Sequence, residues 1–231
     1  MLEQLDYPSQ VQSLVGAAFN RVKDRSGRVR SEELLSALAA VTGELVLRAA
    51  GVFDVYSHDF APGRRVLSTA TNQILFNDTA DWAGVERTST FGAIRSVVAG
   101  SDPRYWAASC FPDIAAVLRL FAETQPTRES WGWVPLSAAP EHRPRLQPLM
   151  AAYELRPVVF ETPLLRDADP KHVITIGALA TIKALLLTKG SIAPEVALSI
   201  VFETINGMSK TAPMTLGHMK QVEEGMAVRR G

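Results

Sequence analysis

The apolar positions near the amino terminus repeat with the period of an α-helix. After Pro8 they recur every three or four residues, which puts them on one helical face that ends at Ser26-Gly27. These positions are Val11, Leu14, Val15, Ala18, Phe19 and Val22. A second helix is predicted from Ser31, an N-cap residue type followed by two glutamates, to Gly51, a residue typical of helix ends. Its apolar positions are Leu34, Leu35, Leu38, Leu45, Val46 and Ala49.

Four further helices are predicted in the middle of the chain. Pro62 suits the first position of one of them, which runs to about Asn77. Its apolar positions are Val66, Leu67, Ala70, Ile74 and Leu75. A weaker pattern that ends at Gly100 indicates another helix. Asp102-Pro103 has the residue types that open a short helix, and Asp113 precedes a longer one with a clear apolar face up to Thr124.

The stretch from residue 126 to residue 148, the Pro/Trp-rich connection, lacks regular periodicity. It contains five prolines and Trp131-Gly132-Trp133, and proline removes a backbone donor and disfavours helix in the residue before it. An irregular stretch of this length is uncommon in a compact domain, so it marks a domain boundary or a functional loop. Beyond it, one or two helical turns are predicted at 149–153 and a short β-strand at 158–160.

The last third of the chain is again predicted to be helical. Asp169-Pro170 opens an apolar helix that ends at Lys189-Gly190, and another helix begins at Pro194 and ends before Asn206-Gly207. We therefore expect an all-α fold with about eight or nine helices, in one compact array or two packed bundles, with little or no β-sheet. Helical regions are expected over 1–125 and 149–231, separated by the connection over 126–148; both could belong to a single domain.

Charge and cysteine content narrow the classes of function. Lys and Arg number 24, as do Asp and Glu, so no net charge favours nucleic acid or an anionic membrane. The single cysteine, Cys110, excludes an intramolecular disulfide, and the acidic amino terminus does not have the pattern of a secretory signal, so we expect a cytoplasmic protein. The apolar run at 173–187 is short for a bilayer and contains Lys183, which favours a buried helix.

The sequence contains none of the motifs of nucleotide, zinc or serine-hydrolase sites. Cys110 precedes a predicted helix start, where a thiolate would be stabilised, but nothing marks a base for it and a small buried apolar role is simpler. No two histidines share a helix face. Asp167, Asp169 and His172 are the closest cluster of metal-ligand types, and helix capping accounts for the aspartates. We therefore predict no metal and no cofactor.

The Pro/Trp-rich connection combines aromatic and charged side chains. These are Arg128, Glu129, Trp131, Trp133, His142, Arg143 and Arg145. Because Trp and Arg are common in binding sites, we take Trp131, Trp133, His142 and Arg143 as candidate ligand-binding residues, although the two rings could simply fix the connection to the core. Lys183 is the fifth candidate, because a lysine in the most apolar helix snorkels at a rim, pairs with a buried carboxylate or lines a pocket.

A second basic segment lies between the first two predicted helices. Residues 21–30 contain five cations and one acid, a composition that could bind a phosphate or a nucleic-acid backbone but is also common on solvated surfaces. The balanced total charge makes nucleic acid an unfavoured partner.

Two functions from different classes fit this sequence. The first is a non-enzymatic helical protein that acts through protein–protein contact or self-association as a homodimer, the commonest assembly of such chains. The second is a small-molecule-binding protein or enzyme, with a pocket between helices near the Pro/Trp-rich connection. No membrane partner is expected.

Overall fold

The computed structural model of the chain describes residues 6–51, 61–77, 88–160 and 169–214. Within these ranges eight α-helices form and no β-strand does, which confirms the prediction of an all-α, multihelical fold. The helices are α1 (Tyr7–Val22), α2 (Ser31–Ala49), α3 (Thr69–Phe76), α4 (Thr90–Ser101), α5 (Ile114–Glu123), α6 (Pro148–Phe160), α8 (Pro170–Leu187) and α9 (Pro194–Met208). Two short 3₁₀ turns, η1 (Ala108–Cys110) and η2 (Pro140–His142), lie in the connections.

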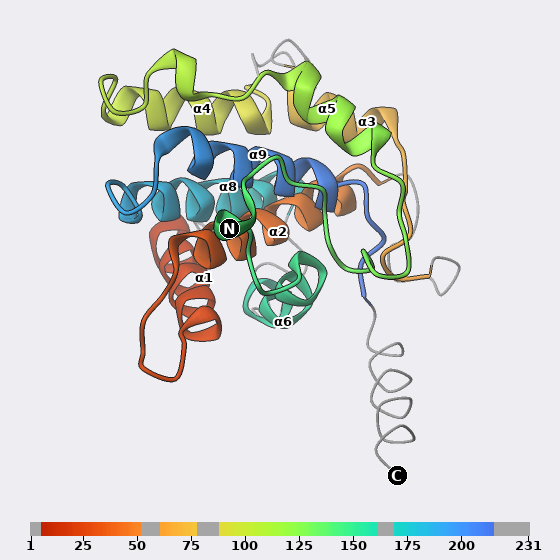
Figure 1. The fold of residues 1–231 in the computed structure, drawn as a ribbon, viewed down its shortest axis with the longest axis horizontal. Helices are drawn as coiled ribbons and strands as arrows, with labels where there is room; N and C mark the ends of the chain where they lie inside the picture. Colours follow the sequence, from red (N-terminus) through yellow and green to blue (C-terminus); the bar gives the residue numbers. More distant parts are fainter. Residues whose placement is uncertain (1–5, 52–60, 78–87, 161–168, 215–231) are drawn as a thin grey trace, which may run out of the picture.

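Helix α2 occupies the centre of the molecule. Its main neighbours are α8 and α9, with α6 on a further side. Figure 1 shows α3, α4 and α5 above this middle layer and α1 and α6 below it. Every residue from Glu33 to Leu47 is buried, so the burial extends well beyond one apolar face. Small side chains allow α2 and its neighbouring helices to approach closely. The hydroxyls of Thr42 and Thr181 form a hydrogen bond of 2.9 Å between α2 and α8.

Helix α8 is the one helix in the described part of the chain that is long and apolar enough to cross a membrane. Half of that apolar window is buried within the protein, where α8 contacts α1, α2 and α4. The core helix of a soluble protein has the same length and composition, and these contacts favour that interpretation. Lys183 lies on the side of α8 that faces α1, where its ammonium donates a hydrogen bond to Gln12.

Two predicted helix starts are wrong. The helix predicted from Pro62 begins at Thr69, because Ser68 caps it. The residues before it pair with the backbone that follows α9, where the Val66 N–H donates to the Lys210 carbonyl at 2.8 Å. Asp102 closes α4 and opens no helix. Its carboxylate accepts from the backbone N–H groups of the next turn, including that of Tyr105 at 3.1 Å.

Two predictions in the last part of the chain are also wrong. The residues expected as a strand, 158–160, lie in α6, whose start was predicted only as a helical turn or two. Burial of Val159 against the core outweighs its β-propensity, and Pro157 is accommodated within the helix. Asn206 and Gly207 lie inside α9 and do not follow it. The predicted starts at Asp113, Asp169 and Pro194 are confirmed.

Candidate functional site

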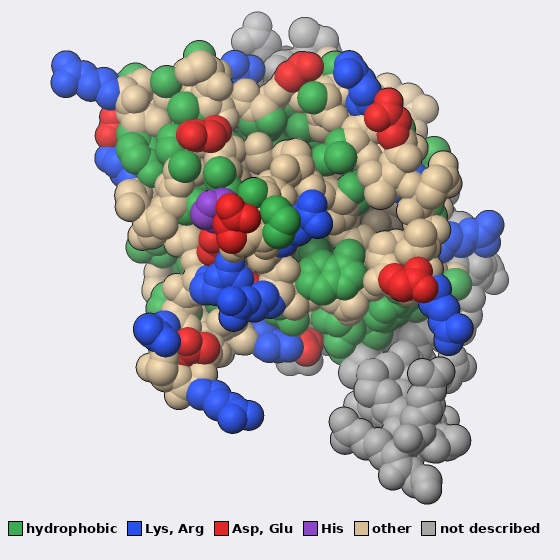
Figure 2. Space-filling model, in the orientation of Figure 1, with side chains coloured by type: hydrophobic (Ala, Val, Ile, Leu, Met, Phe, Trp, Pro, Cys, Tyr) green, Lys and Arg blue, Asp and Glu red, His purple; other side chains and the backbone are tan. Residues whose placement is uncertain are grey.

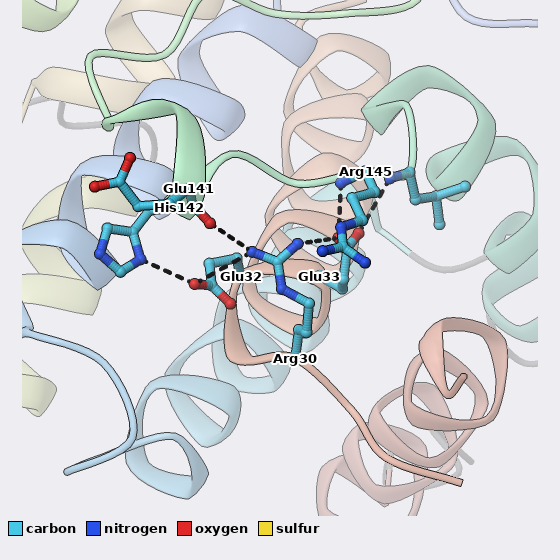
Figure 3. Close-up of polar contacts among 7 residues, drawn as sticks. Arg30, Glu32, Glu33, Glu141, His142 and Arg145 are labelled. Atoms are coloured by element: carbon cyan, nitrogen blue, oxygen red, sulfur yellow. Dashed lines mark hydrogen bonds and ion pairs between the residues drawn. The ribbon is translucent and has the colours of Figure 1, made fainter. Parts of the chain in front are cut away.

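Two glutamates in the first turn of α2 hold the Pro/Trp-rich connection in place. Glu33 accepts hydrogen bonds from the backbone N–H groups of Arg145 at 2.6 Å and Leu146 at 3.1 Å. The neighbouring Glu32 lies 3.0 Å from Nδ1 of His142, as Figure 3 shows. A stretch without helix or strand leaves its backbone donors unpaired, so carboxylates that accept them give the connection a fixed position.

Arg30 completes this cluster from the residue before α2. Its guanidinium donates to Glu33 at 3.2 Å and to the Glu141 carbonyl at 2.8 Å, and it lies 3.5 Å from Glu32 (Figure 3). Burial alone would raise the pKa of the Glu32 carboxyl, but the hydrogen bond with His142 and the charge of Arg30 outweigh it and hold that pKa below its usual value. Glu32 is therefore ionised at neutral pH and keeps Arg30 and the His142 ring close.

A cleft of about 610 Å³ opens beside this cluster, and we call it the cationic cleft. It lies between the α1–α2 connection and residues 145–146. Its lining consists of Arg21, Val22, Lys23, Asp24, Arg28, Val29, Arg30, Glu33, Arg145 and Leu146. Five cations thus face two acids, and Figure 2 shows Lys and Arg side chains gathered over the α1–α2 connection at the lower left. The two basic segments that the sequence identified separately meet here.

Both acids of the cleft already have local partners. Asp24 accepts from the Ser26 hydroxyl at 2.6 Å and from the Arg28 N–H at 3.0 Å, and these hydrogen bonds lower the pKa of Asp24. Glu33 accepts hydrogen bonds from the Arg30 guanidinium and from the backbone of the connection. The carboxylates of the cleft therefore order its walls, and its net charge remains positive.

The five cations differ in how they are engaged. Arg21 forms a two-bond ion pair with Glu154, and Arg30 is held as described above. Lys23 and Arg28 donate to neutral oxygens of nearby side chains, at 3.1 and 2.9 Å, and Arg28 also lies 3.6 Å from the Asp24 carboxylate. Arg145 uses its backbone N–H, while its guanidinium has no hydrogen bond or ion pair to any residue the structure describes. It is exposed at the cleft and available to an anion.

The residues predicted to bind a ligand do not come together. The Trp131 indole donates to the Pro62 carbonyl at 2.9 Å, and the Arg143 guanidinium donates to the Ala138 carbonyl at 3.1 Å. His142 belongs to the cluster beside the cationic cleft, whereas Lys183 contacts α1. Trp133 is partly exposed. None of the five lines the cleft, so their joint role in ligand binding stays a prediction.

Comparison with known proteins adds no analogue for this arrangement. No family model, no curated protein and no solved structure matches the chain. The function must therefore be inferred from the chemistry of the site itself.

Two other candidates from the sequence can be located. Cys110 is partly buried in η1, and its thiol lies 4.0 Å from the Tyr105 carbonyl. Asp169 caps α8 and His172 contacts the Tyr7 hydroxyl, while Asp167 lies outside the described residues. Among the residues that the structure describes, no group of three His, Cys, Asp or Glu side chains is suitable for a metal ion.

Several buried charges escaped the sequence analysis. Glu203 on α9 accepts from the backbone N–H and the hydroxyl of Ser137, at 2.7 and 2.5 Å, and burial raises the pKa of Glu203. Glu44 on α2 pairs with Arg48 and with Arg156 of α6, at 2.6 and 2.9 Å. In the sequence these glutamates look like exposed helix residues, because only the tertiary fold brings the partners to them.

Proposed function

We propose that this protein binds a small anionic ligand, bearing phosphate or carboxylate groups, in the cationic cleft. The observation that carries the proposal is the convergence of Arg145 on the basic α1–α2 connection, which puts an unpaired guanidinium into a concave surface lined by four other cations. A planar guanidinium binds phosphate or carboxylate through two parallel hydrogen bonds.

The size and construction of the cleft support a small ligand. Its volume of about 610 Å³ falls within the roughly 300–1,000 Å³ typical of ligand pockets. Arg30 and the backbone of Arg145 are already fixed by Glu33, so the conformational entropy lost on binding an anion is confined to the free side chains, chiefly that of Arg145. The proposal is for a soluble, cytoplasmic binding protein, and a reaction is not part of it.

Titration calorimetry with inorganic pyrophosphate, at constant ionic strength, tests this proposal. We expect saturable binding to one site, and we expect Arg145→Gln to weaken it about tenfold, the loss of roughly 1.4 kcal/mol. The matched control is Arg143→Gln, which removes a guanidinium of the same segment that does not line the cleft and should retain full affinity. Equal weakening by both variants, or the same heat from sodium chloride, would contradict a specific site.

Self-association as a homodimer has less support. Within the described part of the chain, the exposed large aliphatic and phenyl side chains are distributed over three helices and the segment before α3: Phe19, Leu67, Val97, Leu186 and Leu187. Only Leu186 and Leu187 are adjacent, at the end of α8. The buried core of a homodimer interface is mainly apolar and contiguous, so these scattered side chains give little support to one. Homodimer formation stays a prediction that a light-scattering mass would decide.

A further inference from the structure

A second cavity lies away from the cationic cleft, and we call it the apolar pocket. It has a volume of about 440 Å³ and shares no lining residue with the cleft. The end of α2, helix α3, the start of α4 and the first turns of α8 surround it. Figure 1 places α3 and α4 in the upper layer, whereas the α1–α2 connection lies at the lower left. A ligand in one site would therefore leave the other free.

Small side chains create the hollow. Five alanines line it: Ala49, Ala50, Ala70, Ala93 and Ala178. They come from all four helices, so the space opens where each helix presents a methyl group in place of a longer side chain. Ile74, Val97, Leu179 and Ile182 supply the larger apolar surface.

The polar groups of the apolar pocket are almost all neutral. Among the lining residues that the structure describes, the one charged side chain is Lys171, which lies 3.9 Å from Asp169 and is not free. The Thr175 hydroxyl donates within its own helix, to the Lys171 carbonyl at 2.9 Å. Gln73 is exposed on α3, and its amide forms no hydrogen bond with the residues that the structure describes.

We propose that the apolar pocket binds an uncharged small molecule with a mainly apolar surface and one or two hydrogen-bonding groups. Its volume falls within the roughly 300–1,000 Å³ range of ligand pockets, and such pockets combine an apolar lining with a few polar groups that orient the ligand. A charged ligand would lose its hydration without gaining an unpaired counter-charge from the described lining residues. The Gln73 amide is positioned to recognise the polar end of the molecule. This site is independent of the anion site proposed above.

The test uses N-phenyl-1-naphthylamine, an uncharged aromatic probe whose fluorescence rises on transfer from water to an apolar site. We expect saturable binding of one probe per chain. Ala178→Leu, which fills the pocket from α8, should weaken binding at least tenfold. Ala93→Leu, on the half-buried start of α4, should do the same and serves if the first variant does not fold. The matched control is Ala116→Leu, an exposed alanine of α5 that should change nothing.

Three results would overturn the proposal. They are the absence of saturable binding to the unaltered protein, equal binding by Ala93→Leu, and a change in molecular mass on Ala93→Leu, which would make the pocket an interface between copies. Because the two sites are separate, excess pyrophosphate should not displace the probe. Loss of probe binding would therefore contradict the apolar pocket alone, and loss of pyrophosphate binding would contradict the cationic cleft alone.

Discussion

The central helices and the Pro/Trp-rich connection are both ordered, but by different forces. Helices α2, α8 and α9 pack so closely that a Cβ atom added at Gly43 would lie 2.7 Å from the Ile205 carbonyl oxygen. The connection buries fewer apolar side chains, among them Val134, which packs against Gly207 of α9. Three glutamates of the surrounding helices hold it as well: Glu32, Glu33 and Glu203 accept hydrogen bonds from, or pair with, its residues. Close packing determines the first region, whereas the second depends on individual polar contacts in addition to packing.

This difference explains where the cationic cleft lies. The close contact between α2 and α9 leaves no room for a ligand, whereas an irregular segment fixed at a few points leaves concave surface between those points. Glu33 fixes residues 145 and 146 and leaves the Arg145 side chain free to face the α1–α2 connection. Binding groups are often found on such connections, supported by a rigid scaffold.

The largest effect is expected from a methyl group added to the core. Gly43→Ala should lower the free energy of unfolding by about 3 kcal/mol, the upper part of the range for overpacked cores. The new methyl would meet the Ile205 carbonyl and Met208 Cβ, both at 2.7 Å, and α2 and α9 would have to separate. Urea denaturation gives the change directly.

Gly16→Ala is the matched control, because Gly16 lies within α1 and no heavy atom is within 4 Å of its added Cβ. It should stabilise the protein by about 0.5–1 kcal/mol, since alanine favours a helix interior. If both substitutions stabilise the protein, close approach of α2 and α9 does not hold the core together.

The sequence predicted the core far better than the connection. Apolar periodicity located the helices because burial follows a 3.6-residue repeat, and capping residues such as Asp113 and Asp169 fixed several starts. It missed the central position of α2, because small residues such as Gly43 allow burial on all sides without an apolar stripe. The strand predicted at 158–160 became helix, because local β-propensity is weaker than packing.

The candidate site was predictable only in pieces. Composition identified the basic residues 21–30 and the basic and aromatic connection, but no local pattern shows that Arg145 and Arg28 line one cleft. That proximity depends on Glu33 accepting two backbone N–H groups that lie more than a hundred residues away. Long-range polar pairing leaves no periodic signal in the sequence.

An intermediate effect on the free energy of unfolding is expected from Lys210, a cation buried in the core. Lys210 is 3% exposed, and its ammonium contacts Asn206 and the rings of Phe76 and Phe121, with no acid among the described residues to pair with. Arg65, a second cation, lies over the Phe121 ring. Burial lowers the pKa of Lys210 from 10.5 to about 8. The three helix glutamates that hold the connection, by contrast, all have donors.

Stability should therefore rise with pH above 8. Below pH 8 the lysine carries its proton in both states, so it adds no pH dependence. Between pH 8 and 10.5 the unfolded chain holds a proton that the folded protein has released, which favours folding by up to about 2 kcal/mol. Urea denaturation at pH 7.5 and at about pH 10 measures the rise, and Lys210→Met should abolish it. The same rise in the variant would mean that another group is responsible.

The smallest effect is expected at a single hydrogen bond of the connection. Trp131 and Trp133 are both 36% exposed, but only Trp131 has an indole N–H bonded to a described residue, the Pro62 carbonyl at 2.9 Å. Trp131→Phe should lower the free energy of unfolding by about 1 kcal/mol, the net value of one such bond, while Trp133→Phe should have little effect. Thermal melts of the two variants make the comparison, since both lose the same atoms at the same exposure. Equal losses would show that ring packing holds this end of the connection, and the contrast between a packed core and a hydrogen-bonded connection would then fail at this point.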